Sequence, residues 1–379
     1  MRVTGERVIL RKPKRGDIAD RQAIGRHGEF DRMCGGNTAA ELCYPKRAYW
    51  AKWYRWFRRY RHGFIIEYEG RCAGTARLSN VSKDGQSAAY SIGIFDPALW
   101  SKGLGTEATR LMLRYGFETL GLERIDLDVL EFNARGIRCY EKCGFSRTGI
   151  KQNSCQIDGE YFSDILMAIT RREYELRRGL LLYAISDGNL SDIEAALRGG
   201  ATMLQLRTKG LPDGELLALA RSVKRITDQY GVPLIINDRA DIAVQIDAAG
   251  AHLGLSDGDL RAARALLGPG KTLGATARTV DQALAAEAAG ADYLGSGAVF
   301  GTRTKADAVP MAPGLFKEIC HSVKIPVVAI GGIDRTNIGQ LKGCGMAGFA
   351  VVSGIFGAAD IEGAARELRA LAEETLWKK

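Results

Sequence analysis

Hydrophobic residues follow different patterns in the two halves of the chain. From residue 180 onward, short runs rich in Val, Ile and Leu recur without polar alternation, as expected for strands buried on both faces. Eight runs occupy residues 180–186, 203–207, 233–238, 251–255, 272–277, 293–300, 326–332 and 348–354. Helical stretches separate most of them, among them residues 213–230, 280–289 and 360–374. This alternation predicts an α/β fold, a (β/α)8 TIM barrel, with a doubly wound open sheet as the alternative.

The first half has a mixed pattern. Strands are expected at residues 7–11, 64–68, 72–78, 88–95 and 124–130, followed by a β-hairpin that ends this half. Helices are expected around residues 17–33, 48–60, 106–120 and 135–143. Together these elements predict an α+β domain around one largely antiparallel sheet.

A charged segment separates the two patterns. Residues 170–179 lack a full apolar face and end in glycine, which is typical of a linker helix. We therefore expect a domain over residues 1–172, a linker helix over 173–179 and a barrel over 180–379.

Composition indicates a globular protein, with 46% hydrophobic and 26% charged residues among 379. No apolar run approaches the roughly 20 residues that cross a bilayer, and the N-terminus lacks the apolar core of a signal peptide. The eight cysteines are scattered without a Cys-x-x-Cys pair, so we expect reduced thiols and a cytoplasmic location. Residues 1–180 hold 32 lysines and arginines against 22 acidic residues, a balance of +10, whereas the remainder balances at −1. Such asymmetry indicates two domains with different partners.

A glycine-rich loop in the first half carries one candidate site. Residues 100–107 read Trp-Ser-Lys-Gly-Leu-Gly-Thr-Glu and open a helix. Glycines let backbone amides approach a ligand, and a helix start offers unpaired N–H groups, so the loop suits a diphosphate. An ordinary tight turn is the alternative for the loop taken alone.

The surrounding order of motifs resembles the GNAT N-acetyltransferases, most closely the branch with ribosomal-protein and polyamine acetyltransferases. The motifs are the loop after a strand, a long helix, a strand, residues 131–145 from Glu-Phe-Asn-Ala-Arg-Gly to Lys-Cys-Gly-Phe, and the tail at 157–169. The resemblance implies acetyl-CoA as cofactor. It implies that Leu104, Gly105 and Thr106 hold the CoA diphosphate. It also implies that the backbone of Ile92 and Ile94 pairs with pantetheine and that Asn133 touches the pantetheine arm. Tyr140 is implied to protonate the departing thiolate.

The acceptor and the general base are less defined. Ser91 replaces a glutamate that is common in the family, which leaves Glu67, Tyr90 or a water chain as the base. Residues 48–61 interleave aromatic and basic side chains, which indicates an amphipathic helix with a solvated basic face, or less favoured, a nucleic-acid contact. A basic wall attracts an anionic acceptor and repels a polyamine, so we expect an anionic amine as partner.

Polar residues gather at the ends of the predicted barrel strands, where barrel chemistry takes place. They include Gln205, Arg207, Lys209, Asn237, Asp238, Asp257, Thr276, Thr302, Thr304, Lys305, Gly332 and Ser353. The glycine pair after strand seven and Ser-Gly after strand eight match a phosphate site. Three cations and two aspartates indicate a second, metal-bridged diphosphate. His252 lies on a buried strand and is interpreted as a packed core residue.

These strand ends resemble thiamin phosphate synthase and its relative, the thiazole tautomerase. The motifs are Gln-Leu-Arg-x-Lys, Leu-Ile-Ile-Asn-Asp-Arg-Ala-Asp, Gly-Ala-His-Leu-Gly, Thr-x-Thr-Lys-x-Asp-Ala and Val-Val-Ser-Gly-Ile. The resemblance implies that Asp238 and Asp257 bind Mg²⁺ and that Gln205 contacts the pyrimidine of a hydroxymethylpyrimidine diphosphate. It assigns the leaving diphosphate to Arg207, Lys209, Asn237, Thr276 and Lys305, with Arg207 and Lys305 as catalytic groups. Gly332 and Ser353 would hold the thiazole phosphate.

The chain departs from the synthase pattern at three positions, Thr208, Leu255 and Thr276, where Glu, Gln and Ser are usual. The tautomerase resemblance calls for a histidine after strand five, where this chain has Arg278. Three hypotheses follow. The leading one is a bifunctional acetyltransferase and thiamin phosphate synthase; the others are a barrel that acts as a tautomerase or a non-catalytic sensor of thiamin precursors, and an acetyltransferase directed at RNA or ribosomes.

Overall fold

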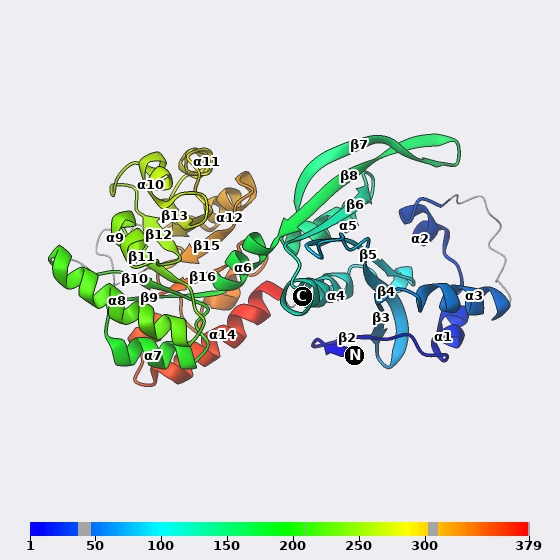
Figure 1. The fold of residues 1–379 in the computed structure, drawn as a ribbon, viewed down its shortest axis with the longest axis horizontal. Helices are drawn as coiled ribbons and strands as arrows, with labels where there is room; N and C mark the ends of the chain where they lie inside the picture. Colours follow the sequence, from blue (N-terminus) through cyan, green and yellow to red (C-terminus); the bar gives the residue numbers. More distant parts are fainter. Residues whose placement is uncertain (37–46, 209, 302–309, 378–379) are drawn as a thin grey trace. The chain divides into compact units, whose positions relative to one another are not determined.

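The computed structural model describes residues 1–36, 47–208, 210–301 and 310–377 (Figure 1). The chain forms two compact units, Met1–Tyr174 and Glu175–Lys378, and each is treated by itself below. Among the described helices of both units, none combines the length and apolar character needed to cross a membrane.

One eight-stranded sheet forms the centre of the first unit, in the order β1-β2-β3-β4-β5-β6-β8-β7. Its strands are β1 (Arg2–Thr4), β2 (Val8–Arg11), β3 (His62–Tyr68), β4 (Arg71–Ser79), β5 (Ser87–Ile94), β6 (Arg124–Leu130), β7 (Ser146–Ile157) and β8 (Glu160–Thr170). Neighbouring strands are antiparallel except β5 and β6, which are parallel. The predicted α+β domain with a largely antiparallel sheet is confirmed.

Helices cover both faces of this sheet. They are α1 (Asp17–Ile24), α2 (Gly28–Met33), α3 (Arg47–Phe57), α4 (Leu104–Arg114) with a π-helical turn at Tyr115–Thr119, and α5 (Ala134–Lys142). The larger core cluster joins the sheet to α4 and α5, and a smaller cluster around Phe57, Ile65 and Phe95 lies beneath α1 and α3. The single helix expected around residues 17–33 is wrong, because Gly25 with φ of 75° ends α1. Helix α6 (Arg171–Gly179) connects the two units.

The second unit is a closed barrel of eight parallel strands in the order β10-β11-β12-β13-β14-β15-β16-β9. The strands are β9 (Leu182–Ser186), β10 (Met203–Leu206), β11 (Leu234–Asn237), β12 (Gly250–Leu253), β13 (Thr272–Ala277), β14 (Tyr293–Gly297), β15 (Val327–Ile330) and β16 (Gly348–Val351). The surrounding helices are α7 (Leu190–Arg198), α8 (Asp213–Gln229), α9 (Ala240–Gln245), α10 (Leu260–Leu267), α11 (Val280–Ala288), α12 (Pro313–Ser322), α13 (Ser353–Phe356) and α14 (Ile361–Trp377). All eight expected strands are present, so the barrel is confirmed and the open sheet is excluded.

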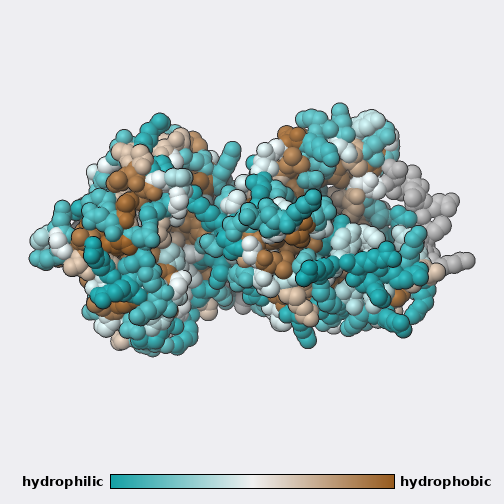
Figure 2. All heavy atoms as spheres, viewed as in Figure 1, coloured by the Kyte–Doolittle hydropathy of each residue, from teal (hydrophilic) through white to brown (hydrophobic). Residues whose placement is uncertain are grey.

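Strand burial explains why the pattern identified the barrel. Every residue of β9, β10, β12, β14 and β16 is buried, since side chains alternate between the barrel interior and the surrounding helices. Hydrophilic residues cover most of the visible face of each unit (Figure 2). Because parallel strands all point the same way, the polar residues that follow them meet at one end of the barrel.

Candidate active sites

The sheet of the first unit opens between β5 and β6. These strands pair only at residues 87–89 with 124–126, whereas β6 continues along β8 to its end. Residues 90–94 of β5 therefore diverge from β6 and leave backbone groups on that side. The strand that carries Ile92 and Ile94 is placed for an extended ligand, although the indole Nε1 of Trp100 already donates to the Ile94 carbonyl at 2.8 Å.

The glycine-rich loop ends where α4 begins. Ser101 and Gly103 have φ of 57° and 84°, so the backbone turns sharply twice before the helix. Arg7 fastens the loop, because its Nη1 donates to the Lys102 carbonyl at 2.9 Å and its Nε pairs with Glu107 at 3.3 Å. The Leu104 side chain is buried in the core and does not cover the backbone amides of the first turn of α4, which face the loop. This geometry suits a bound diphosphate.

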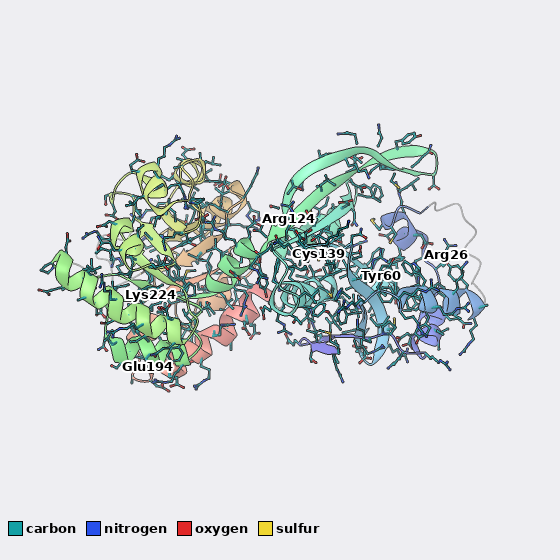
Figure 3. All side chains as sticks on the ribbon, in the orientation of Figure 1. Arg26, Tyr60, Arg124, Cys139, Glu194 and Lys224 are labelled. Carbon is teal, nitrogen blue, oxygen red and sulfur yellow. The ribbon has the colours of Figure 1, made fainter. Side chains whose placement is uncertain are left out.

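Gly105 leaves room at this turn. A Cβ atom added at Gly105 would have the Cys139 Sγ atom, 3.8 Å away, as its nearest neighbour outside the helix backbone (Cys139 is labelled in Figure 3). The fold itself therefore does not require glycine here. Close approach of a ligand to the amides is the physical reason that remains for it.

Tyr140 lies on α5 with 9% of its surface exposed. Burial raises the pKa of its hydroxyl well above the ordinary range, so the phenol stays protonated and can act as a proton donor. Its ring contacts Tyr90 and Phe145, but no hydrogen bond joins its hydroxyl to the described residues. Asn133 on the same segment caps α5, since its Oδ1 accepts from the Gly136 amide at 2.9 Å.

Neither side chain considered as a general base has the properties of one. Glu67 pairs with Arg11 and Lys14, and its hydrogen bond with Arg11 lowers its pKa. The Tyr90 hydroxyl is buried against Thr109 Oγ1 at 2.9 Å, and burial raises its pKa well above 10. Near neutrality the ionised Glu67 is therefore only a weak base, and the protonated Tyr90 cannot accept a proton at all.

A thiol beside the loop was missed by sequence reasoning. Thr106 Oγ1 lies 3.4 Å from the Cys139 Sγ atom, and a hydrogen bond with Cys143 lowers the pKa of Cys139 to about 7. The signal was the four-residue spacing of these cysteines on an amphipathic helix, which places both on one face.

Asp238 and Asp257 come together at the rim of the barrel. Asp238 follows β11 with φ of 63°, and its amide donates to the His252 carbonyl at 2.8 Å. Burial, followed by a hydrogen bond and charge repulsion from Asp257, raises the pKa of Asp238 to about 6, while Arg207 opposes this shift. Asn237, the last residue of β11, precedes this pair. Because the two carboxylates repel each other, a positive ion bound between them would be stabilised.

The pair fits Mg²⁺ as a partial site. Groups of three or more His, Cys, Asp or Glu side chains with metal-binding geometry are absent from the described part of the chain. Mg²⁺ is commonly held by one or two carboxylates together with water and substrate phosphates. Asp238 and Asp257 would therefore hold the ion only in part, and the substrate would complete its coordination.

A chain of polar side chains crosses the barrel interior. Gln205 Nε2 donates to Tyr183 Oη at 2.7 Å, and Tyr183 Oη lies 2.8 Å from Tyr293 Oη. His252 Nδ1 lies 3.1 Å from Tyr293 Oη, and its Nε2 lies 3.1 Å from Thr276 Oγ1. His252 is 9% exposed and is buried as expected, but it belongs to a polar network rather than to apolar packing. Tyrosines on inward positions of apolar strands were the signal for this network.

Glycines bring the last two strand ends together. A Cβ atom at Gly332 would lie 2.3 Å from the Gly301 carbonyl, and one at Gly354 would lie 2.4 Å from the Ile333 carbonyl. Asn337 Nδ2 donates to the Gly332 carbonyl at 2.7 Å, which fixes the first of these loops. Ser353 begins α13 beside it and is exposed. The two loops expected to hold a phosphate are therefore adjacent.

Four of the expected barrel residues, Lys209, Thr302, Thr304 and Lys305, lie outside the described residues.

Of the departures from the synthase pattern, Leu255 is 51% exposed just beyond β12, and Thr276 occupies the end of the polar network. Leu255 therefore places an apolar side chain at the rim, whereas Thr276 keeps the hydroxyl that serine would supply.

Comparison with known proteins identifies both units. Residues 182–355 match the family model for thiamine monophosphate synthase, and residues 7–146 match that for the acetyltransferase (GNAT) domain. Thiamine-phosphate synthase 2 of Streptococcus pneumoniae serotype 4 is 48% identical over 193 residues, which cover 49% of this chain and 92% of that protein. The chain belongs to the thiamine-phosphate synthase family.

Other members of the thiamine-phosphate synthase family give the same result. The enzyme of Pyrococcus furiosus is 40% identical over 205 residues, or 53% of this chain and 99% of that protein. The solved structure of thiamine phosphate pyrophosphorylase from Pyrococcus furiosus has 38% identity and a TM-score of 0.50, covering 53% of this chain and 98% of that one. The family accounts for the second unit, and the GNAT acetyltransferase domain is an additional first unit. Both are transferase domains, so the chain is a bifunctional enzyme.

Proposed function

We propose that the barrel couples hydroxymethylpyrimidine diphosphate to thiazole phosphate and releases diphosphate. The bond between the pyrimidine methylene carbon and the diphosphate oxygen breaks, and its electron pair leaves with diphosphate. The lone pair of the thiazole nitrogen then forms the new carbon–nitrogen bond. The observation that carries this proposal is the convergence of Arg207, Asp238 and Asp257 at one rim.

The side chains of the barrel bind and orient the substrates. Arg207, Lys209, Asn237, Thr276 and Lys305 would hold the leaving diphosphate, and we extend this role to Thr302 and Thr304. Gln205, fixed by Tyr183, would contact the pyrimidine. Gly332 and Ser353 would hold the thiazole phosphate. When bound by Asp238 and Asp257, Mg²⁺ would supply positive charge to the diphosphate.

Arg278 favours the synthase over the tautomerase. It occupies the position after β13 where the tautomerase resemblance calls for a histidine, and its guanidinium cannot exchange protons near neutrality. The test is to incubate the full-length protein with hydroxymethylpyrimidine diphosphate, thiazole phosphate and Mg²⁺. Thiamin phosphate is the expected product. Tautomerase activity in its place would reverse the assignment, and neither activity would favour a sensor.

For the first unit we propose acetyl transfer from acetyl-CoA to an amine. The amides of Leu104, Gly105 and Thr106 would hold the CoA diphosphate, and the divergent strand with Ile92 and Ile94 would pair with pantetheine near Asn133. The amine attacks the thioester carbonyl and loses a proton to water, the carbon–sulfur bond breaks, and Tyr140 protonates the thiolate. Calorimetry with acetyl-CoA tests the binding step directly.

The acceptor is proposed to be anionic. Lys52, Arg55, Arg58, Arg59 and Arg61 are all exposed on and just after α3, and this basic face repels polyamines. Efficient spermidine acetylation that survives charge reversal at Arg58 and Arg59 would contradict this. Retention of the protein on RNA that weakens with salt would favour the RNA-directed alternative.

Seven described cysteines are free, which supports a cytoplasmic location.

A further inference from the structure

Arg21 on α1 is a buried cation, and no carboxylate of the described residues forms an ion pair with it. It is 4% exposed, and its guanidinium carbon lies 4.2 Å from the ring centres of both Trp50 and Phe95. Its Nη1 donates to the Gly25 carbonyl, but its Nε is buried without a hydrogen-bond partner in the described part of the chain. The Nε1 of Trp50, beside it, is also buried and has no hydrogen-bond partner among the described residues. Burying an unpaired donor costs free energy, so a bound acceptor would stabilise this arrangement.

Arg77 on β4 repeats the pattern on the same face of the sheet. Its guanidinium carbon lies 4.4 Å from the ring centre of Tyr60 (Figure 3) and 5.3 Å from that of Trp56, and its Nε is buried without a hydrogen bond to any described residue. Arg11 shows the ordinary solution in the same unit, since it pairs with Asp17 and Glu67. Aromatic faces stabilise a guanidinium but leave its N–H groups free for an anion.

This face lies beside the opening between β5 and β6. Arg77 is paired across the strands with Ser91, at the start of the divergent part of β5. A Cβ atom at Gly93 would lie 3.0 Å from the Phe30 ring, so the opening is lined by that aromatic side chain. The guanidinium carbon of Arg21 lies 5.9 Å from the ring centre of the same Phe30. Both arginines therefore lie on the face that carries the divergent part of β5.

We infer that Arg21 and Arg77 form a binding site for an anionic group, carboxylate or phosphate, carried by the amine that is acetylated. The inference rests on the proposed acetyltransferase function and specifies its acceptor. An anion offers lone pairs to both unpartnered Nε groups, while the rings of Trp50 and Phe95 keep the guanidinium of Arg21 in place. The exposed basic face after α3 would attract such an acceptor, and these two arginines would bind it.

Anion binding can be measured without any catalysis. The full-length protein, labelled with ¹⁵N-arginine, is titrated with acetate, inorganic phosphate and neutral acetamide while the Nε–Hε resonances are followed by NMR. Arg77→Lys and Arg21→Lys assign the two signals by their loss, because lysine keeps the charge but has no Nε. The control is the Nε–Hε signal of Arg71, an exposed arginine on the same strand as Arg77, which the variant Arg71→Lys assigns.

The expected result is a saturable shift of the Arg21 and Arg77 signals with an anion, and none with acetamide or at Arg71. A response to acetate alone identifies a carboxylate acceptor, and a response to phosphate alone identifies a phosphorylated amine. No saturable shift, or an equal shift at Arg71, overturns the inference. If Arg21→Lys does not fold, the Arg77 signal decides.

Matched amines then test the acceptor. Lysine and cadaverine differ by one carboxylate, and phosphoethanolamine and ethanolamine differ by one phosphate. With acetyl-CoA, the anionic member of the preferred pair should have a kcat/KM at least about tenfold higher, a difference that Arg77→Gln removes and Arg71→Gln retains. If the anionic and the neutral amine react equally well while acetyl-CoA binds normally, the inference is overturned but the proposed acetyltransferase function is not. Loss of acetyl-CoA binding by the native protein would contradict the proposed function instead, and if neither amine reacts, the anion titration decides.

Discussion

His252 Nε2 lies 3.1 Å from Thr276 Oγ1, and this contact joins the buried interior of the barrel to its reactive rim. The other ring nitrogen lies 3.1 Å from Tyr293 Oη. A histidine with both nitrogens engaged holds its neighbours in one orientation. The hydroxyl proposed to bind diphosphate is thereby positioned by a side chain that does not itself need to contact substrate.

Replacing His252 with leucine should lower the free energy of unfolding by about 1–3 kcal/mol, because buried hydroxyls lose a partner. Urea denaturation of the full-length protein measures this. His321→Gln is the matched control, since His321 is exposed and bonds only a helix carbonyl within its described surroundings. Equal stability of the two variants would show that the network is energetically unimportant.

The same residue predicts a pH dependence. Burial lowers the pKa of His252 from 6.5 to about 4, so the folded protein keeps the ring neutral. Above pH 6.5 both states are unprotonated and stability is unaffected. As the pH falls from 6.5 to 4, His252 becomes protonated in the unfolded chain but stays neutral in the folded protein. The free energy of unfolding should therefore fall by up to about 3 kcal/mol. His252→Leu should remove this part of the slope in urea titrations across that range.

Asp238→Asn should lower the rate of thiamin phosphate formation about hundredfold, equivalent to roughly 3 kcal/mol of transition-state stabilisation. Asparagine tolerates the positive φ of this position, so the backbone should remain intact. Asp247→Asn is the control, because Asp247 also has a positive φ, of 54°, but is highly exposed. A normal rate in Asp238→Asn would show that this carboxylate takes no part in the reaction.

Protons should compete with Mg²⁺ at the same pair. Because the pKa of Asp238 is raised to about 6, this carboxylate is mostly protonated once the pH falls below that value. The Mg²⁺ concentration for half-maximal activity should therefore rise as pH falls below 6, more steeply than for a site with ordinary aspartates. A requirement for Mg²⁺ that stays constant from pH 7 to about pH 5 would contradict this.

Gly105→Leu should reduce acetyl-CoA affinity about hundredfold or more while leaving the fold intact, because the added side chain blocks approach to the amides. Space next to Gly105 accommodates a Cβ atom within the protein. Ala48→Leu, at the second position of α3 as Gly105 is of α4, is the control. Calorimetry gives both affinities. Unchanged binding in Gly105→Leu would place the diphosphate elsewhere.

Sequence was sufficient where periodicity and buried strands determine structure. The eight barrel strands follow from apolar runs, and the rim residues follow from the strand ends. What could not be predicted depends on side chains from distant segments. The pairing of Arg7 with Glu107, and the polar chain from Gln205 to Thr276, join residues that share no local pattern. Gly25 ended a helix that the apolar spacing alone extended to residue 33.

Tyr140→Phe should lower turnover of the acetyltransferase by about a hundredfold and leave acetyl-CoA affinity unchanged, because only the proton donor is removed. The slow hydrolysis of acetyl-CoA serves as the assay until the acceptor is known, and calorimetry gives the affinity. Tyr161→Phe, on the 63% exposed tyrosine of β8, is the matched control. Since burial raises the pKa of Tyr140 above 10, native turnover should show no loss of the acid as pH approaches 10. Equal turnover in Tyr140→Phe and native protein would mean that the thiolate leaves without this proton.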